Sequence, residues 1–223
     1  MDINKKKAIE NRINAVGEKL RRNNMEFYYA ENASDVRGIV ESLMKDGDTV
    51  THGGSVSMAE CGINELLNSG RYNYLDRSKA SSPEEADEIY RKAFSADVFI
   101  SSANAITDDG VLYNVDGNSN RIAAIAFGPS SVIIIAGYNK LVHDLREAEM
   151  RVKTQAAPPN CVRLSCPTYC AEKGECVSLL KADHEISDGC GGDGRICCNY
   201  LISAQQRHKG RIKVILVGEE LGY

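Results

Sequence analysis

The sequence predicts an α/β fold with a mostly parallel sheet and flanking helices. Short apolar segments rich in β-branched residues alternate along the chain with longer segments whose apolar residues recur at helical spacing. The short segments are typical of strands covered on both faces, and their alternation with helices favours parallel strand order. With 223 residues, of which 43% are hydrophobic, the chain is long enough for one well-packed domain over residues 1–223.

The first half of the chain is predicted to alternate helices and strands from its beginning. Ile9, Ile13, Val16 and Leu20 recur at intervals of three and four residues, which indicates an N-terminal helix in the region 1–30. Further helices are expected at 34–45, from the turn at 53–55 to about 68, and at 83–94, where a proline suits the first turn. Strands are expected at 26–30, 48–52, 73–75 and 97–101.

The second half continues this pattern and then changes character. Apolar runs predict strands at 121–127, 131–136 and 211–217. A helix is expected from 141 to 157, ended by Pro158 and Pro159, because proline breaks a helix interior. Asp-Gly turns on both sides of 111–113 predict a hairpin. The segment 161–198 is rich in cysteine and poor in strand or helix signals, so we expect an insert before the last strand.

Composition and motifs exclude several classes of function. The net charge of −4 argues against non-specific nucleic-acid binding, and no apolar run reaches the length of a membrane span. The charged beginning of the chain lacks a signal-peptide core, so a cytoplasmic location is the expectation. The chain has no nicotinamide or flavin fingerprint.

The turn in THGGSVSMAECG is a candidate anion site. Gly53, Gly54 and Ser55 stand between a predicted strand and a predicted helix. Glycine permits close backbone approach, a helix N-terminus presents free N–H groups, and open sheets bind ligands at the carboxyl ends of their strands. The alternative is a tight turn in which a serine caps the helix, and the residues do not decide between the two.

The segment SANAITDDGVLYNVDGNSNR, residues 102–121, is a second candidate. Two turns explain its glycines but not Asn104, Asn114, Asn120 and Arg121, whose amides and guanidinium suit an anionic ligand. A hydrogen-bond network that braces an irregular loop is the alternative. Under the ligand hypothesis, replacing Asn120 and Arg121 with alanine abolishes binding and leaves the fold intact. Asp109 and Asp116 are the candidate catalytic bases, although turn chemistry also explains both.

Seven of the eight cysteines lie between 161 and 198. In a reducing cytoplasm such clustering indicates metal ligation rather than disulfides. Cys61 stands at helical spacing from Met58 and is expected in the core.

Several stretches together resemble the lactate-utilisation (LUD-domain) family. The segment SANAITDDGVLYNVDGNSNRIAAIAFGPSSVIIIAGYNKLV is similar to its signature, and NNMEFYYAEN, HGGSVSMAECG, YLDR and KGRIKVILVGEELGY are similar to its short, stand-alone clostridial-type members. The resemblance implies a fold similar to ribose-5-phosphate isomerase, glucosamine-6-phosphate deaminase and CoA transferases. It also implies a role in the oxidation of L-lactate to pyruvate beside iron–sulfur partner proteins.

By analogy with those folds, the glycine turn and the 102–121 segment would surround one pocket for lactate, pyruvate, or a phosphorylated or CoA-type ligand. Lys140, in GYNKLV, is a further candidate for this pocket, and a solvated lysine at a helix start is the alternative. The resemblance also implies four metal-binding positions, Cys170, Cys176, Cys190 and Cys197.

The spacing of those cysteines departs from the family pattern. Thirteen residues separate Cys176 from Cys190 where a C-x-x-C is expected, and Leu179 stands at the position of the close cysteine. Cys161, Cys166, Cys198 and His184 are therefore possible substitutes for the fourth ligand. Four thiolates suit structural Zn²⁺ or a [4Fe–4S] cluster.

Three functional hypotheses follow. The first is a component of lactate oxidation with a small-anion pocket, acting with a redox partner. The second is a non-enzymatic adaptor subunit that carries a metal and needs no ligand in the pocket. The third is a sugar-phosphate or CoA-type isomerase or transferase, which needs a carboxylate in the pocket.

Overall fold

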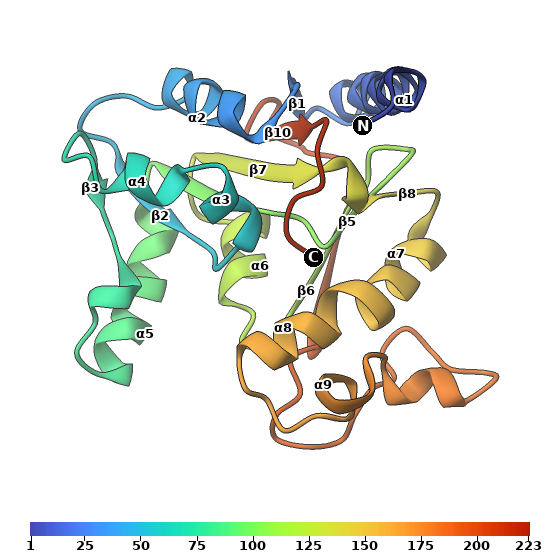
Figure 1. Cartoon of the computed structure of the whole chain (residues 1–223). Coiled ribbons are helices and arrows are strands. Elements are labelled where there is room, and N and C mark those ends of the chain that lie inside the picture. Colours follow the sequence, from blue (N-terminus) through green and yellow to red (C-terminus); the bar gives the residue numbers. More distant parts are fainter.

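The computed structural model describes all residues 1–223 and confirms the α/β class. Its main sheet has six parallel strands in the order β1-β10-β7-β4-β2-β3 (Figure 1). The strands are β1 (Glu26–Ala30), β2 (Thr49–His52), β3 (Asn73–Tyr74), β4 (Val98–Ser101), β7 (Ser131–Gly137) and β10 (Ile212–Val217). Because all six run the same way, their carboxyl ends meet at one edge of the sheet.

A second sheet has the order β8-β5-β6-β9. It consists of β5 (Ala105–Thr107), β6 (Leu112–Asp116), β8 (Leu141–Val142) and β9 (Asn199–Ser203). β5 and β6 form the predicted antiparallel hairpin, and β9 extends it with antiparallel pairing to β6. The 102–121 segment therefore supplies two central strands of this sheet as well as the loops on either side of the hairpin.

Helices cover both faces of the main sheet. The α-helices of the whole chain are α1 (Ile3–Arg22), α2 (Ala33–Ser42), α3 (Val56–Glu60), α4 (Ile63–Leu67), α5 (Pro83–Lys92), α6 (Asn120–Ala126), α7 (Leu145–Arg151), α8 (Ala157–Arg163) and α9 (Tyr169–Lys173). Alternate residues of β7 face opposite cores. Ile133 and Ile135 pack with α2, α3 and α4, whereas Val132 and Ile134 pack with α1, α6 and the second sheet. A third, smaller cluster joins β5 and β6 to α7 and α8.

The Cys-rich segment lies beyond α8, at the end of the molecule away from α1 and α2 (orange in Figure 1). It contains α9 and a short 3₁₀ turn at Val177–Leu180, and little else that is regular. No helix of the chain is both long and apolar enough to cross a membrane.

The strand predicted at 121–127 is wrong, because these residues form α6. Asp116 accepts hydrogen bonds from the backbone N–H groups of Arg121 and Ile122, at 3.0 and 3.2 Å, and so satisfies the free donors of a helix start. Alanine occupies three of the seven helical positions and favours a helix. A short apolar run alone does not distinguish a buried helix from a strand.

The single helix predicted over 141–157 is also wrong. Leu141 and Val142 pair with β5 as β8, and α7 starts only after Asp144, which caps it by accepting from the Glu147 N–H. A π-helical turn at Val152–Ala156 follows, and the two prolines begin α8 instead of ending a helix. Proline suits a first turn because the N–H it lacks has no partner there.

Candidate functional site

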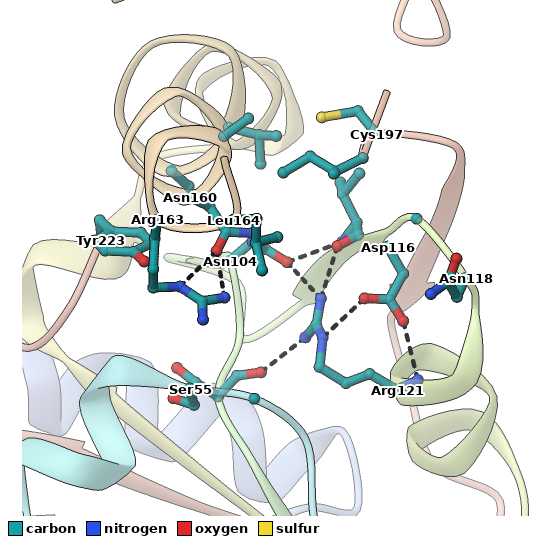
Figure 2. A pocket seen from close by; sticks show the side chains of 18 of the residues that line it. Ser55, Asn104, Asp116, Asn118, Arg121, Asn160, Arg163, Leu164, Cys197 and Tyr223 are labelled. Carbon is teal, nitrogen blue, oxygen red and sulfur yellow. Dashed lines mark hydrogen bonds and ion pairs between the residues drawn. The ribbon is translucent and has the colours of Figure 1, made fainter. Parts of the chain in front are cut away.

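A pocket of about 430 Å³ opens at the carboxyl edge of the main sheet. One wall is the turn after β2, the second is formed by the residues after β4 and β6, and the third comes from α8 and residues 193–197. Figure 2 shows this arrangement, with Ser55 from the first wall, Asn104, Asp116 and Arg121 from the second, and Arg163 from the third. The predicted glycine turn and the 102–121 segment thus border one cavity, where ligands of open α/β sheets bind.

The two glycines of the turn allow arginines to approach the backbone. A Cβ atom on Gly53 would lie 2.9 Å from Cδ of Arg121, and one on Gly54 would lie 2.5 Å from Nη2 of Arg77. Ser55 caps α3, its Oγ accepting from the Met58 N–H at 3.4 Å. Gly54 and Ser55 line the pocket, whereas Gly53 lies behind Arg121.

Arg121 uses all of its hydrogen-bond donors within the protein. Its Nε donates to Asp116 Oδ1 at 3.1 Å, and its four Nη hydrogens go to the side-chain oxygens of Asn104 and Asn114 and the carbonyls of Ser102 and Val115, at 2.8–3.1 Å. A guanidinium has five N–H donors, so none is left for a ligand. Arg121 lines the pocket as predicted, but it braces the loop, which was the alternative interpretation of this segment.

The predicted amides divide in the same way. Asn104 lines the pocket, and its Oδ1 accepts from Val115 N–H and from Arg121, both at 2.9 Å. Asn114 is fully buried behind the wall. Asn120 borders the pocket at the start of α6.

The two candidate catalytic carboxylates lie apart. Asp116 lines the pocket, but its oxygens accept from two backbone N–H groups and from Arg121. Asp109 does not line the pocket; its side chain is 80% exposed and lies 3.4 Å from Lys19 on α1. The structure therefore does not bring Asp109 to the site, and it gives Asp116 a capping and pairing role.

Three arginines that sequence reasoning missed also line the pocket: Arg77, Arg163 and Arg195. Arg77 follows the end of β3, so the rule used for the other strand ends would have found it. Arg163 ends α8, where its Nε and Nη2 donate only to Asn160 Oδ1, at 3.1 and 2.7 Å. Arg195 donates to backbone carbonyls of the Cys-rich segment. These three with Arg121 and Lys140 make five basic side chains, four of them arginines, against the two carboxylates of Asp116 and Asp193.

Lys140 is buried at the pocket, in a 3₁₀ turn after β7. Its Nζ donates to Ser57 Oγ at 2.9 Å and to Ser102 Oγ at 2.8 Å. Burial, and after it the charges of Arg151 and Arg121, lower its pKa to about 7, while Glu60 acts in the opposite direction. The interpretation as a solvated lysine therefore does not hold.

Five thiols line a second, smaller and more enclosed cavity of about 20 Å³: Cys161, Cys170, Cys176, Cys190 and Cys197. The four predicted positions come together, and Cys161 joins them with its Sγ 3.6 Å from that of Cys170. All cysteines are free, and burial raises the pKa of both Cys161 and Cys197 to about 12. No three His, Cys, Asp or Glu side chains are arranged to hold a single ion. Cys61 is a core residue, as predicted.

The other proposed substitutes lie elsewhere. Cys166 borders the first pocket, Cys198 is exposed, and His184 lies 3.6 Å from Glu149. The two cavities share one wall, made by Val152, Ala157, Arg195, Ile196 and Cys197.

Comparisons with known proteins agree with this architecture. A family model described as LUD domain matches residues 13–217. The chain is similar to the crystal structure of a DUF162 family protein from Deinococcus radiodurans, at 14% identity over 95% of this chain and 98% of that one, with a TM-score of 0.52. It is more distantly similar to eIF2B beta from Chaetomium thermophilum, at 16% identity and a TM-score of 0.35 over 50% of this chain and 43% of that one. No curated protein is significantly similar in sequence.

Proposed function

The chain belongs to the LUD-domain family, and from this premise we propose that it binds a small organic anion of the lactate and pyruvate class in the pocket. In this proposal it is a component of L-lactate utilisation and acts with a redox partner, because it carries no nicotinamide or flavin fingerprint. The observation that carries the proposal is a surplus of cations whose donors are not used within the protein.

The donors that remain for a ligand come from residues other than Arg121. Arg163 donates hydrogen bonds only to Asn160 on its own helix, and Arg77 donates one, from Nη1 to the Tyr90 hydroxyl at 3.3 Å. Both guanidiniums keep free N–H groups, and a guanidinium can bind one carboxylate through two parallel N–H donors. Lys140 lies at the same pocket, but its Nζ already donates to the hydroxyls of Ser57 and Ser102, so the free donors are those of the two arginines. A ligand with one carboxylate group matches this distribution of charge.

The pocket volume leaves room for larger anions. At about 430 Å³ it falls in the size range of small-molecule sites, so a phosphorylated or CoA-type ligand stays a candidate beside lactate. The isomerase hypothesis requires a free carboxylate base. Asp116 is engaged by three donors, so Asp193, an exposed carboxylate at the same pocket, would have to serve as that base.

Isothermal titration with pyruvate, L-lactate, a sugar phosphate and CoA tests the proposal. We expect pyruvate or L-lactate to bind, and Arg163→Ala to weaken that binding about tenfold or more, since a hydrogen bond to a charged group contributes about 1.5–3 kcal/mol. Arg146→Ala, on the exposed surface of α7, is the matched control and should bind as the unmodified protein does. The proposal fails if neither acid binds, or if both variants bind equally well.

The thiol-lined cavity supports a second role, as a metal carrier. Five thiolates are a donor set suited to soft metals, and the segment around them has little core of its own. A tetrahedral Zn²⁺ site with bonds of about 2.3 Å needs sulfurs about 3.8 Å apart. The pair formed by Cys161 and Cys170 meets that spacing, but a third thiol must move to complete the site. A [4Fe–4S] cluster tolerates a wider spread, because each thiolate binds a different iron.

Metal content measured on protein purified without oxygen separates these alternatives. Roughly four irons per chain with broad visible absorption would support a cluster and an electron-transfer role. One zinc without colour would make the segment a structural clip. Protein that is folded, fully reduced and free of both metals would end the metal-carrier hypothesis.

A further inference from the structure

Lys140 is buried, and its Nζ forms no ion pair with a carboxylate. The only side chains that its Nζ contacts are the hydroxyls of Ser57 and Ser102. The charged groups around it are Arg151 from α7, Arg121 from α6 and Glu60 from α3. Arg151 is itself buried and donates to the carbonyls of Asn139 and Asn104, not to a carboxylate. The ammonium form would therefore be a buried charge between two guanidiniums.

The hydrogen bonds of Lys140 fit a neutral amine. Ser57 Oγ donates to the Leu221 carbonyl at 3.2 Å, and Ser102 Oγ donates to the Ala103 carbonyl at 3.3 Å. Both hydroxyls therefore accept from Lys140, and they provide two acceptors. An ammonium group has three hydrogens to place, whereas a neutral amine has two, so the neutral form is fully satisfied and keeps a free lone pair. Desolvation and neighbouring cations are the means by which a lysine becomes a nucleophile.

Lys153 provides the comparison within the same chain. It is also buried, but its Nζ lies 2.8 Å from Glu149 Oε1 and donates to the Glu185 carbonyl at 3.1 Å. This lysine is a satisfied cation at the thiol-lined cavity. The chain thus contains one buried lysine arranged to stay charged and one, at the anion pocket, arranged to be neutral.

We propose that Lys140 forms an imine with the carbonyl carbon of a 2-oxo acid bound in the pocket. The proposal rests on the proposed anion pocket, whose free arginines would hold the carboxylate of the same molecule. The lone pair of Nζ attacks the carbonyl carbon, the carbonyl electrons move to oxygen, and that oxygen leaves as water after protonation. The hydroxyls of Ser57 and Ser102 touch Nζ and can relay the protons. The step needs no oxidant or reductant.

The test is reductive trapping with pyruvate as the probe. The full chain is incubated with pyruvate at pH 8, treated with borohydride, digested and mapped by mass spectrometry. At this pH an amine with a pKa of about 7 is about 90% neutral, whereas an ordinary lysine is about 0.3% neutral. We expect a reduced adduct on Lys140, favoured over Lys153 and the surface lysines by on the order of a hundredfold.

Three controls make the result decisive. L-lactate, which has no carbonyl group, should give no adduct and should compete with pyruvate. Lys140→Met, which removes the amine and keeps an uncharged side chain of similar length, should give none. Pyruvate that binds by titration but leaves no adduct on Lys140 overturns the imine and leaves the anion pocket standing. Adducts spread evenly over all lysines also overturn it, and absence of both binding and adduct overturns both proposals.

Discussion

The structure predicts that Arg121→Ala weakens the fold rather than acting on the ligand alone. The guanidinium and the Asp116 carboxylate form an ion pair whose side chains are only 13% and 15% exposed. Removing one partner of a buried pair costs about 3–5 kcal/mol, and the residual exposure here places the expected loss near 3 kcal/mol. The carboxamide oxygen of Asn114, fully buried, also loses its hydrogen bond.

Urea denaturation followed by far-ultraviolet circular dichroism measures this loss. With a slope of about 2 kcal/mol per molar urea, a loss of about 3 kcal/mol lowers the midpoint by roughly 1.5 M. Arg163→Ala is the matched control, because this exposed guanidinium contacts only Asn160, and its change should stay within about 0.5 kcal/mol.

The opposite pattern would refute the reasoning. If Arg121→Ala unfolds at the same urea concentration as the unmodified protein and loses pyruvate binding, its guanidinium is a ligand group. The bracing network would then carry no measurable stability, and the sequence-based hypothesis of direct binding by this arginine would stand.

Three further predictions concern the pocket and the thiols. Gly54→Ala should lower the affinity for pyruvate measured by titration, because the added methyl group displaces the Arg77 guanidinium. Asp109→Asn, outside the pocket, should leave the affinity unchanged. Equal affinities of the two variants would contradict this prediction. Raising the pH from 7 to 9 should stabilise the protein relative to Lys140→Met in urea denaturation. At pH values between the folded-state pKa of Lys140, about 7, and its usual value of 10.5, the unfolded chain binds more protons than the folded chain, so stability rises with pH. A difference in unfolding free energy between the protein and Lys140→Met that does not change with pH would contradict the buried neutral amine. Cys170→Ser should lower bound metal in elemental analysis, whereas Cys198→Ser should not.

Much of the fold could be predicted because its central strands are buried on both faces. The run at 131–136 is almost wholly apolar and forms the buried strand β7, whereas the run at 26–30 forms the half-buried edge strand β1. The run at 121–127 was misassigned because its apolar character is shared by helices and strands. The Asp116 carboxylate, four residues before the helix begins, accepts hydrogen bonds from two backbone N–H groups of its first turn and so favours the helix. The spacing of apolar residues does not reveal such a contact.

The location of the site could also be predicted, but not the role of each residue. Parallel strands bring their carboxyl ends together, so the polar residues after β2 and β4 had to meet. Whether an arginine there binds a ligand or stabilises the loop depends on how many of its N–H groups find acceptors within the protein. Arg121 finds five and Arg163 finds one acceptor atom, a difference that appears only when the chain is folded.

The pocket and the thiols are coupled through the wall they share. Arg163 and residues 193–197 belong to the segment that carries the cysteines, and Ile196 and Cys197 face both cavities. That segment has few regular elements, so a group bound by the five thiols would help to fix its position. A group that binds there stabilises the folded arrangement by mass action. If the proposed metal and the proposed anion both bind, the metal would also hold the third wall of the pocket, and the affinity of the pocket for a carboxylate would report the state of the thiols.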